Sequence, residues 1–151
     1  RYSRRFKNIF RKMKIISHRG NLMGKSDYEN DPKQIKACLS LGIDCEIDLW
    51  VKDNKYWLGH DEPKYEIKRS FLQQPGLWIH CKNLEALEKA PPKTNYFWHQ
   101  TDDFTLTSKG YIWTFPGKNV GKKSVIVDNS EDWDTNSYNC FAICTDYVLK
   151  K

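Results

Sequence analysis

The sequence predicts an α/β fold with mostly parallel strands, and three observations support this prediction. Short apolar, strand-like runs recur from residue 13 onward. Turn-rich or helical stretches separate these runs. The strand, helix, strand spacing favours parallel strands with right-handed crossovers, which gives an α/β barrel or an open sheet. The expected strands cover residues 14–17, 43–51, 56–58, 77–81, 96–99, 111–114, 124–127 and 141–148.

Two helices are expected between these strands. The first begins after an N-cap at Asn30 or Asp31 and ends at Gly42. Asn83 caps the second helix, which covers residues 84–89. The connections in the second half of the chain are too short for full helices, so a barrel built this way is abbreviated.

The length of 151 residues fits one domain, and the charge divides it into two parts. Seven basic residues and no acidic one lie in the first fourteen positions, which leaves 18 of the 25 basic residues against 19 acidic ones. We therefore expect residues 1–12 to be a flexible basic extension and residues 13–151 to be the folded domain. The extension could attract phosphate or an anionic membrane, although blocks of like charge are usually solvated.

Cysteine usage and hydropathy predict a cytoplasmic protein without a transmembrane segment. The five cysteines are scattered through apolar segments with no CxxC pair, and no secretory leader precedes them. No apolar run reaches the roughly 18 residues that a membrane span requires. The sequence leaves the oligomeric state open.

All four histidines lie at, or just after, the carboxyl end of an expected strand. In parallel α/β folds this end of the sheet carries the ligand, because its loops vary while the strands hold them in place. One such histidine is ordinary, whereas four together indicate a site. They are His18, His60, His80 and His99.

Glu46 and Asp48 alternate along an apolar strand, so their carboxylates point to the same face. Two adjacent anions repel and need a cation, and a pair of hard oxygen ligands suits Mg²⁺ or Ca²⁺. The alternative is an exposed acidic face on an edge strand. The apolar residues between and beside the two acids favour a buried strand and hence a metal site.

Three further residues extend the predicted site. His80 and Lys82 alternate at the end of the expected strand 77–81 and therefore share one face of it. Lys82 is placed to bind a phosphate oxygen. Arg19 offers a guanidinium fork that matches a phosphate, and Gly20 permits a sharp turn beside it.

Four segments in order resemble the glycerophosphodiester phosphodiesterase family. They are HRG at 18–20, EN at 29–30, GIDCEIDLW at 42–50 and LGHD at 58–61. The resemblance implies a TIM-type (β/α) barrel, here abbreviated, that hydrolyses glycerol phosphodiesters with a divalent cation. It also implies a hairpin turn at residues 53–55 that delivers the second catalytic histidine.

Carried onto this chain, the resemblance implies a role for each residue. His18 and His60 become the acid and base, and Arg19 becomes a phosphate clamp. The metal ligands are Glu46 and Asp48. Supporting residues are Glu29, Asp61 and Asp146, the last within FAICTDYV, which is similar to the last strand of the family's barrel.

The chain departs from the family pattern at His80. The family usually has a glutamate followed two residues later by a lysine, whereas this chain has His80 and Lys82. We expect His80 to join the metal ligands in place of that glutamate. An imidazole weakens the binding of hard cations and makes Mn²⁺ more competitive with Mg²⁺ and Ca²⁺.

The expected function is therefore metal-dependent phosphodiester hydrolysis by a pair of histidines, on a small phosphodiester substrate. Water or a neighbouring substrate hydroxyl could be the nucleophile. Two alternatives remain open: a non-catalytic module that binds phosphorylated glycans or lipids, and nucleic-acid binding through residues 1–12. The nearly neutral body does not favour nucleic acid.

Overall fold

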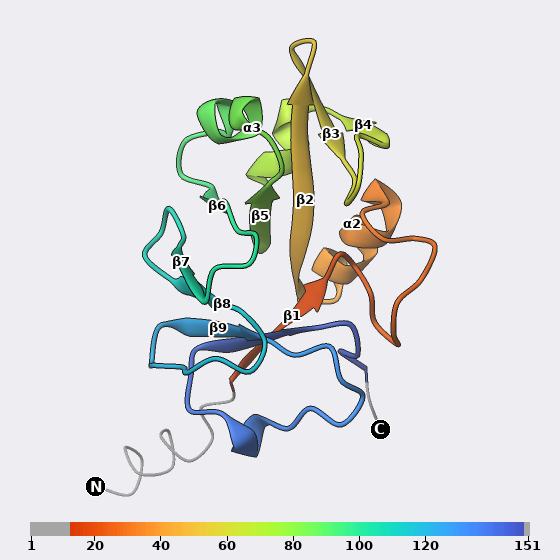
Figure 1. Cartoon of the computed structure of the whole chain (residues 1–151). Helices are drawn as coiled ribbons and strands as arrows, with labels where there is room; N and C mark the ends of the chain where they lie inside the picture. Colours follow the sequence, from red (N-terminus) through yellow and green to blue (C-terminus); the bar gives the residue numbers. More distant parts are fainter. Residues whose placement is uncertain (1–12, 150–151) are drawn as a thin grey trace, which may run out of the picture.

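The computed structural model describes residues 13–149, which form one curled, mixed sheet with two α-helices on its outer side (Figure 1). The elements in chain order are β1 (Lys14–His18), α2 (Pro32–Ser40), β2 (Asp44–Lys52), β3 (Lys55–Leu58), β4 (Tyr65–Ile67), the 3₁₀ helix η1 (Arg69–Gln73), β5 (Leu77–Cys81), α3 (Leu84–Lys89), β6 (Asn95–Phe97), β7 (Phe104–Leu106), β8 (Ile112–Thr114), β9 (Ser124–Val127), the 3₁₀ helix η2 (Thr135–Ser137) and β10 (Ala142–Thr145).

Parallel pairing runs through the centre of the sheet. In space the strands follow the order β6, β5, β2, β1, β10 and β9, and β8 pairs with β9 in parallel as well. The short strands β3, β4 and β7 add antiparallel pairs. No strand pairing joins β6 to β8 among the described residues, so the sheet curls into a half-barrel without closing.

The prediction of an abbreviated TIM-type barrel was therefore wrong. Such a barrel needs a helix after nearly every strand, but among the described residues only α2 and α3 are α-helices, and both pack against β2. The connection from β9 to β10 contains only the three-residue η2. Trp133 and neighbouring side chains from this connection cover Ile126 and Ile143, where a barrel would place a helix.

The two helices begin where the sequence predicted, because their capping side chains make the expected hydrogen bonds. The Asp31 carboxylate accepts from the backbone N–H of Lys33 at 2.9 Å. The Asn83 side chain accepts from Ala86 N–H at 3.1 Å. Gly42, with φ at +77°, follows the end of α2.

Alternation along β2 places acidic and apolar side chains on opposite faces of the sheet. Cys45, Ile47 and Leu49 belong to the core beneath the helices. Glu46 and Asp48 consequently face the concave side. The lower part of that side is filled by a second core that includes Trp78, Phe97 and Trp113.

Strand β2 changes neighbours along one edge. Its first residues pair with β1 as far as Glu46, and its last residues pair with β3 from Leu49 onward. The predicted hairpin turn between β2 and β3 is confirmed, with Asp53 and Asn54 both at positive φ. Asp48 lies at the fork between these two neighbours.

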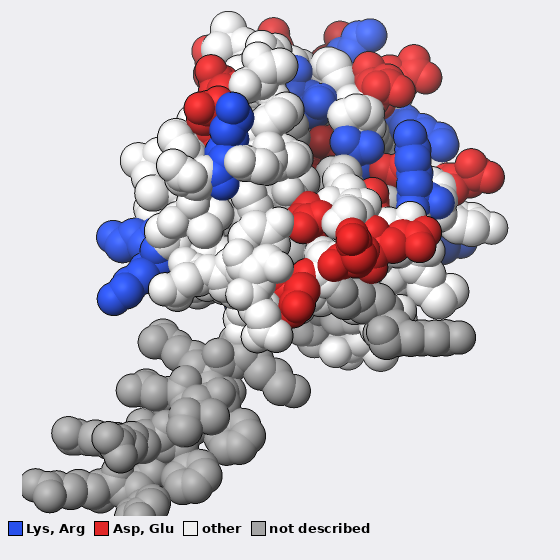
Figure 2. Space-filling model, turned by 60° about the horizontal axis from the view of Figure 1, so that its bottom comes forward, with Lys and Arg blue, Asp and Glu red and all other residues white. Residues whose placement is uncertain are grey.

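No helix in the described part of the chain has the length and apolar character needed to cross a membrane. The predicted basic extension, residues 1–12, lies outside the described residues. On the face shown in Figure 2, basic and acidic side chains of the described residues are interspersed.

Candidate metal and phosphodiester site

Glu46, Asp48 and His80 meet on the concave side of the sheet. The two acids come from β2, and His80 comes from β5, where it pairs directly with Asp48 in the strand register. One ligand atom from each residue can be chosen so that all three lie within 4.8 Å of one another. Ligand atoms bound at about 2.0–2.2 Å to one cation lie at most about 4.4 Å apart, so a bound ion would draw these three atoms closer together.

The two carboxylates are buried, and each has one oxygen without a hydrogen-bond partner. Glu46 is 2% exposed and Asp48 is 0% exposed. Glu46 Oε1 and Asp48 Oδ1 accept no hydrogen bond. A buried carboxylate oxygen without a partner is costly, and a bound cation would remove that cost.

The pKa values of the two acids shift in opposite directions. Burial, assisted by the Asp48 charge, raises the pKa of Glu46 well above its ordinary value. Burial acts in the same direction on Asp48, but contacts with His60 and His80 outweigh it and lower the pKa of Asp48.

The Asn30 side chain forms hydrogen bonds with both the backbone and the side chain of Asp48. Its Nδ2 donates to Asp48 Oδ2 at 2.9 Å, and its Oδ1 accepts from the Asp48 backbone N–H at 2.8 Å. From the sequence, Asn30 was expected only as a helix cap and as part of the EN pair, so this contact was missed. Asn30 has a positive φ of 63°, in the left-handed region that asparagine adopts more readily than most residues.

His18 is oriented by Asp146, the predicted supporting residue. Its Nδ1 lies 2.7 Å from Asp146 Oδ1, which also accepts from Asn21 Nδ2 at 2.9 Å. Burial alone would raise the pKa of Asp146, but the contacts with His18 and Asn21 lower it, so Asp146 is ionised and His18 Nδ1 is the donor. His18 Nε2 is left facing the site, 3.7 Å from Glu46 Oε2.

The β2–β3 hairpin brings His60 back to Asp48. Strand β3 ends beside Leu49, and Gly59 N–H donates to the Asp48 carbonyl at 3.1 Å. His60 Nδ1 then lies 3.6 Å from Asp48 Oδ2. A Cβ on Gly59 would lie 1.9 Å from the Glu62 carbonyl oxygen, so only glycine fits this turn.

Arg19 lies between the predicted catalytic and metal-binding residues. Its Nη1 donates to Glu29 Oε2 at 2.9 Å, and its Nε lies 3.3 Å from Asp48 Oδ2. Its Nη2 is 3.4 Å from His60 Nε2, which must accept because a guanidinium only donates. Glu29 thus orients the arginine and is not among the three grouped ligand residues.

The remaining predicted residues lie at the edge of the site. Lys82 follows β5 and is half-buried, and its charge opposes the raised pKa of Glu46. Asp61 is exposed, and its carboxylate lies 3.6 Å from His60 Nε2. The ring of His99 turns away to the Asp102 carbonyl, at 2.7 Å, so His99 contributes only its backbone oxygen to the site.

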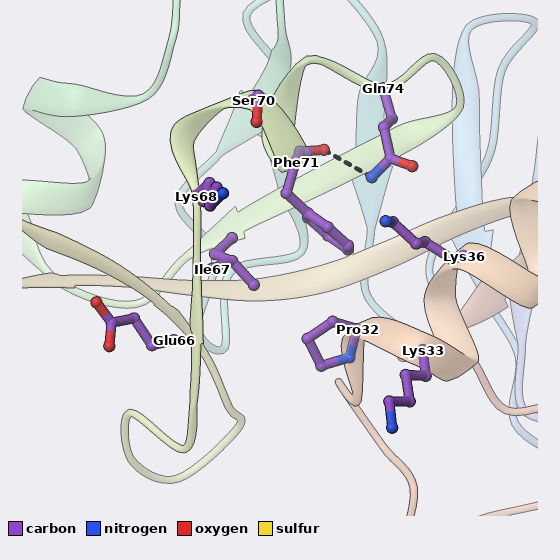
Figure 3. A pocket seen from close by; sticks show the side chains of 9 residues that line it. All are labelled: Pro32, Lys33, Lys36, Glu66, Ile67, Lys68, Ser70, Phe71 and Gln74. Carbon is purple, nitrogen blue, oxygen red and sulfur yellow. Dashed lines mark hydrogen bonds between the residues drawn. The ribbon is translucent and has the colours of Figure 1, made fainter.

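A separate hollow of about 440 Å³ lies between the start of α2 and the β4–η1 segment (Figure 3). Its walls include Lys33, Lys36, Lys68 and the ring of Phe71. None of the predicted site residues lines it. The candidate site is therefore distinct from this hollow.

The residues present fit a divalent cation. Two carboxylates and one imidazole supply a net charge of −2 when the imidazole is neutral, which matches a dication. Two unpartnered carboxylate oxygens already face the same region. Glu46, Asp48 and His80 are the residues that would hold the ion.

No family model matches this chain, and no curated protein or solved structure shows significant similarity to it.

Proposed function

We propose that this protein is a metal-dependent phosphodiesterase that acts on small, glycerophosphodiester-like substrates. The observation that carries the proposal is the convergence of three kinds of group at one end of the concave face. Glu46 and Asp48 belong to the candidate cation site, and His18, His60 and Arg19 each lie close to one of these two carboxylates. Phosphoryl transfer requires these groups: charge neutralisation, proton transfer and phosphate binding.

The histidines supply the proton transfers. One ring nitrogen takes the proton of the nucleophile as its oxygen forms a bond to phosphorus. The other histidine gives a proton to the alkoxide as the second P–O bond breaks. His18 is oriented for this by Asp146, in the same way that a carboxylate orients the histidine of a catalytic triad.

Arg19 and Lys82 bind the phosphate oxygens. Arg19 is 16% exposed as a side chain, so part of it remains reachable from the concave face. Glu29 holds its guanidinium by one nitrogen and leaves the fork oriented. A cation held by Glu46, Asp48 and His80 would add Lewis-acid stabilisation of the charge on the phosphoryl oxygens.

We also propose that the protein works in a reducing, cytoplasmic compartment. All five cysteines are free thiols in the structure, and four of them are buried. This pattern is compatible with such a compartment and supplies no disulfide that would need an oxidising one.

The proposal is tested by assaying the purified protein against bis(p-nitrophenyl) phosphate and glycerophosphodiesters with Mg²⁺, Ca²⁺ or Mn²⁺. We expect product with at least one ion, loss of turnover in His18→Ala and in Glu46→Gln, and little change in Glu66→Gln. Glu66 is an exposed carboxylate on β4 and serves as the matched control. If the protein binds these compounds but forms no product under any of these conditions, the phosphodiesterase proposal is refuted and a phosphate-binding module is favoured.

A further inference from the structure

The His80 ring is locked in one tautomer when it is neutral. Its Nε2 lies 2.7 Å from the backbone carbonyl oxygen of His99. A carbonyl oxygen can only accept, so Nε2 carries the proton. The lone pair of the neutral ring is therefore on Nδ1.

That lone pair faces a buried carboxylate oxygen. His80 Nδ1 lies 3.3 Å from Asp48 Oδ1, the oxygen that accepts no hydrogen bond. Two electron-rich atoms at this distance repel unless a positive charge lies between them. A metal ion bound by both atoms supplies that charge.

The surroundings of His80 hold its ring in place to bind a metal ion. Phe97 stacks on it, with ring centroids 5.2 Å apart and planes inclined by 11°. The carbonyl that accepts its proton belongs to a turn in which the His99 ring contacts the Asp102 carbonyl. Ligating histidines typically have their second nitrogen anchored by a carbonyl or carboxylate in this way.

From this geometry we infer that the site selects a first-row transition-metal dication, of which Mn²⁺ is the probe ion, over Ca²⁺ and Mg²⁺. The inference rests on the metal-binding part of the proposed function. Ca²⁺ takes 6–8 oxygen ligands, and Mg²⁺ prefers oxygen and keeps its water. A fixed nitrogen ligand beside two carboxylates favours the borderline metals instead.

The test measures metal binding without substrate. Metal-free protein is titrated with Mn²⁺ while the free-ion resonance is followed by electron paramagnetic resonance, and Ca²⁺ or Mg²⁺ is then added as competitor. We expect one Mn²⁺ per chain, bound at least about tenfold more tightly than either competitor. Spin-echo modulation of the bound Mn²⁺ should show one directly coordinated nitrogen.

His80→Gln is the informative variant. Glutamine can still donate to the His99 carbonyl, but it offers the metal an amide oxygen. We expect the nitrogen modulation to vanish and the preference for Mn²⁺ over Ca²⁺ to fall by about tenfold or more. His60→Gln, which changes a histidine outside the grouped ligands, should leave the modulation in place.

Equal competition by Ca²⁺ or Mg²⁺, or a Mn²⁺ complex without a coordinated nitrogen, would overturn the inference. Both readings come from the unmodified protein, so they do not depend on the variants folding. A protein that hydrolyses phosphodiesters but binds Ca²⁺ and Mn²⁺ equally would refute only the metal selectivity. A protein that binds Mn²⁺ through His80 but hydrolyses nothing would refute only the phosphodiesterase proposal.

Discussion

Gly59→Ala should reduce catalysis while sparing the metal site. An added Cβ would lie 1.9 Å from the Glu62 carbonyl oxygen and 3.1 Å from the Lys64 backbone nitrogen. Real Cβ contacts essentially never fall below 3.0 Å, so the backbone must move by about 1.1 Å. His60 is the next residue and moves with it.

A displacement of about 1 Å at a catalytic group can cost about 10²-fold in rate. We therefore expect kcat for bis(p-nitrophenyl) phosphate to fall by about that factor. Overpacking at the turn should also cost about 1–3 kcal/mol of folding free energy. Metal affinity should change little, because the three ligand residues lie on β2 and β5 and not on the hairpin turn.

The matched control is Gly121→Ala, whose Cβ would meet only Ser124 Oγ at 4.0 Å. Rates are compared at a temperature well below the melting point of both variants, which is checked by circular dichroism. If Gly59→Ala keeps kcat within about twofold of the unmodified protein, then His60 does not act from the position described here.

Three further predictions concern other parts of the structure. Asn30→Ala removes two hydrogen bonds from the central aspartate and should weaken Mn²⁺ binding by about 10–100-fold, as measured by titration. The hydrogen bond to Asp128, at 2.6 Å, raises the pKa of Tyr138 from 10.0 to about 12. Stability from this group is therefore complete below about pH 10 and is lost as the pH rises towards about 12, so denaturant melts over this window should decline less steeply in Tyr138→Phe. Ile47→Ala should cost about 2–5 kcal/mol in urea unfolding, whereas Leu41→Ala, at a side chain 66% exposed, should stay within about 0.5 kcal/mol.

Local signals predicted most of the elements, because capping residues and strand-like runs act over a few residues. Asn83 caps its helix as expected, and Asp31, one of the two expected candidates, caps the other. Residues 77–81 and 124–127 are strands as expected. Strands β4 and β7 were missed, since each has only three residues and no apolar alternation long enough to identify.

The abbreviated TIM-type barrel was wrongly predicted because the formation of a barrel depends on long-range strand pairing. The motifs between residues 18 and 61 are compatible with any sheet that brings β1, β2 and β5 together. Whether β6 meets β8 depends on the segment between them. That segment contains β7, which pairs with β8 as a short antiparallel hairpin. Between β6 and β8 the contact is made by side chains: Phe97 stacks on Trp113, with ring centroids 4.5 Å apart.

The candidate site was predicted in part for a similar reason. Alternation along one strand was enough to pair Glu46 with Asp48, because that inference is local. The contact of Asn30 with Asp48 and the carbonyl of His99 that fixes His80 depend on loops folding back onto the sheet. A backbone carbonyl leaves no trace in residue identity, so no sequence pattern could have indicated it.

The fork in β2 has a consequence for motion. Because Asp48 lies between the end of one ladder and the start of the next, its amide proton is held by the Asn30 side chain and not by a neighbouring strand. Exchange of this single amide with solvent should therefore report opening of the loop between β1 and α2, while the amides of β2 on either side stay protected by the sheet. The residue at the centre of the site thus carries a probe of loop opening that can be read without substrate or metal.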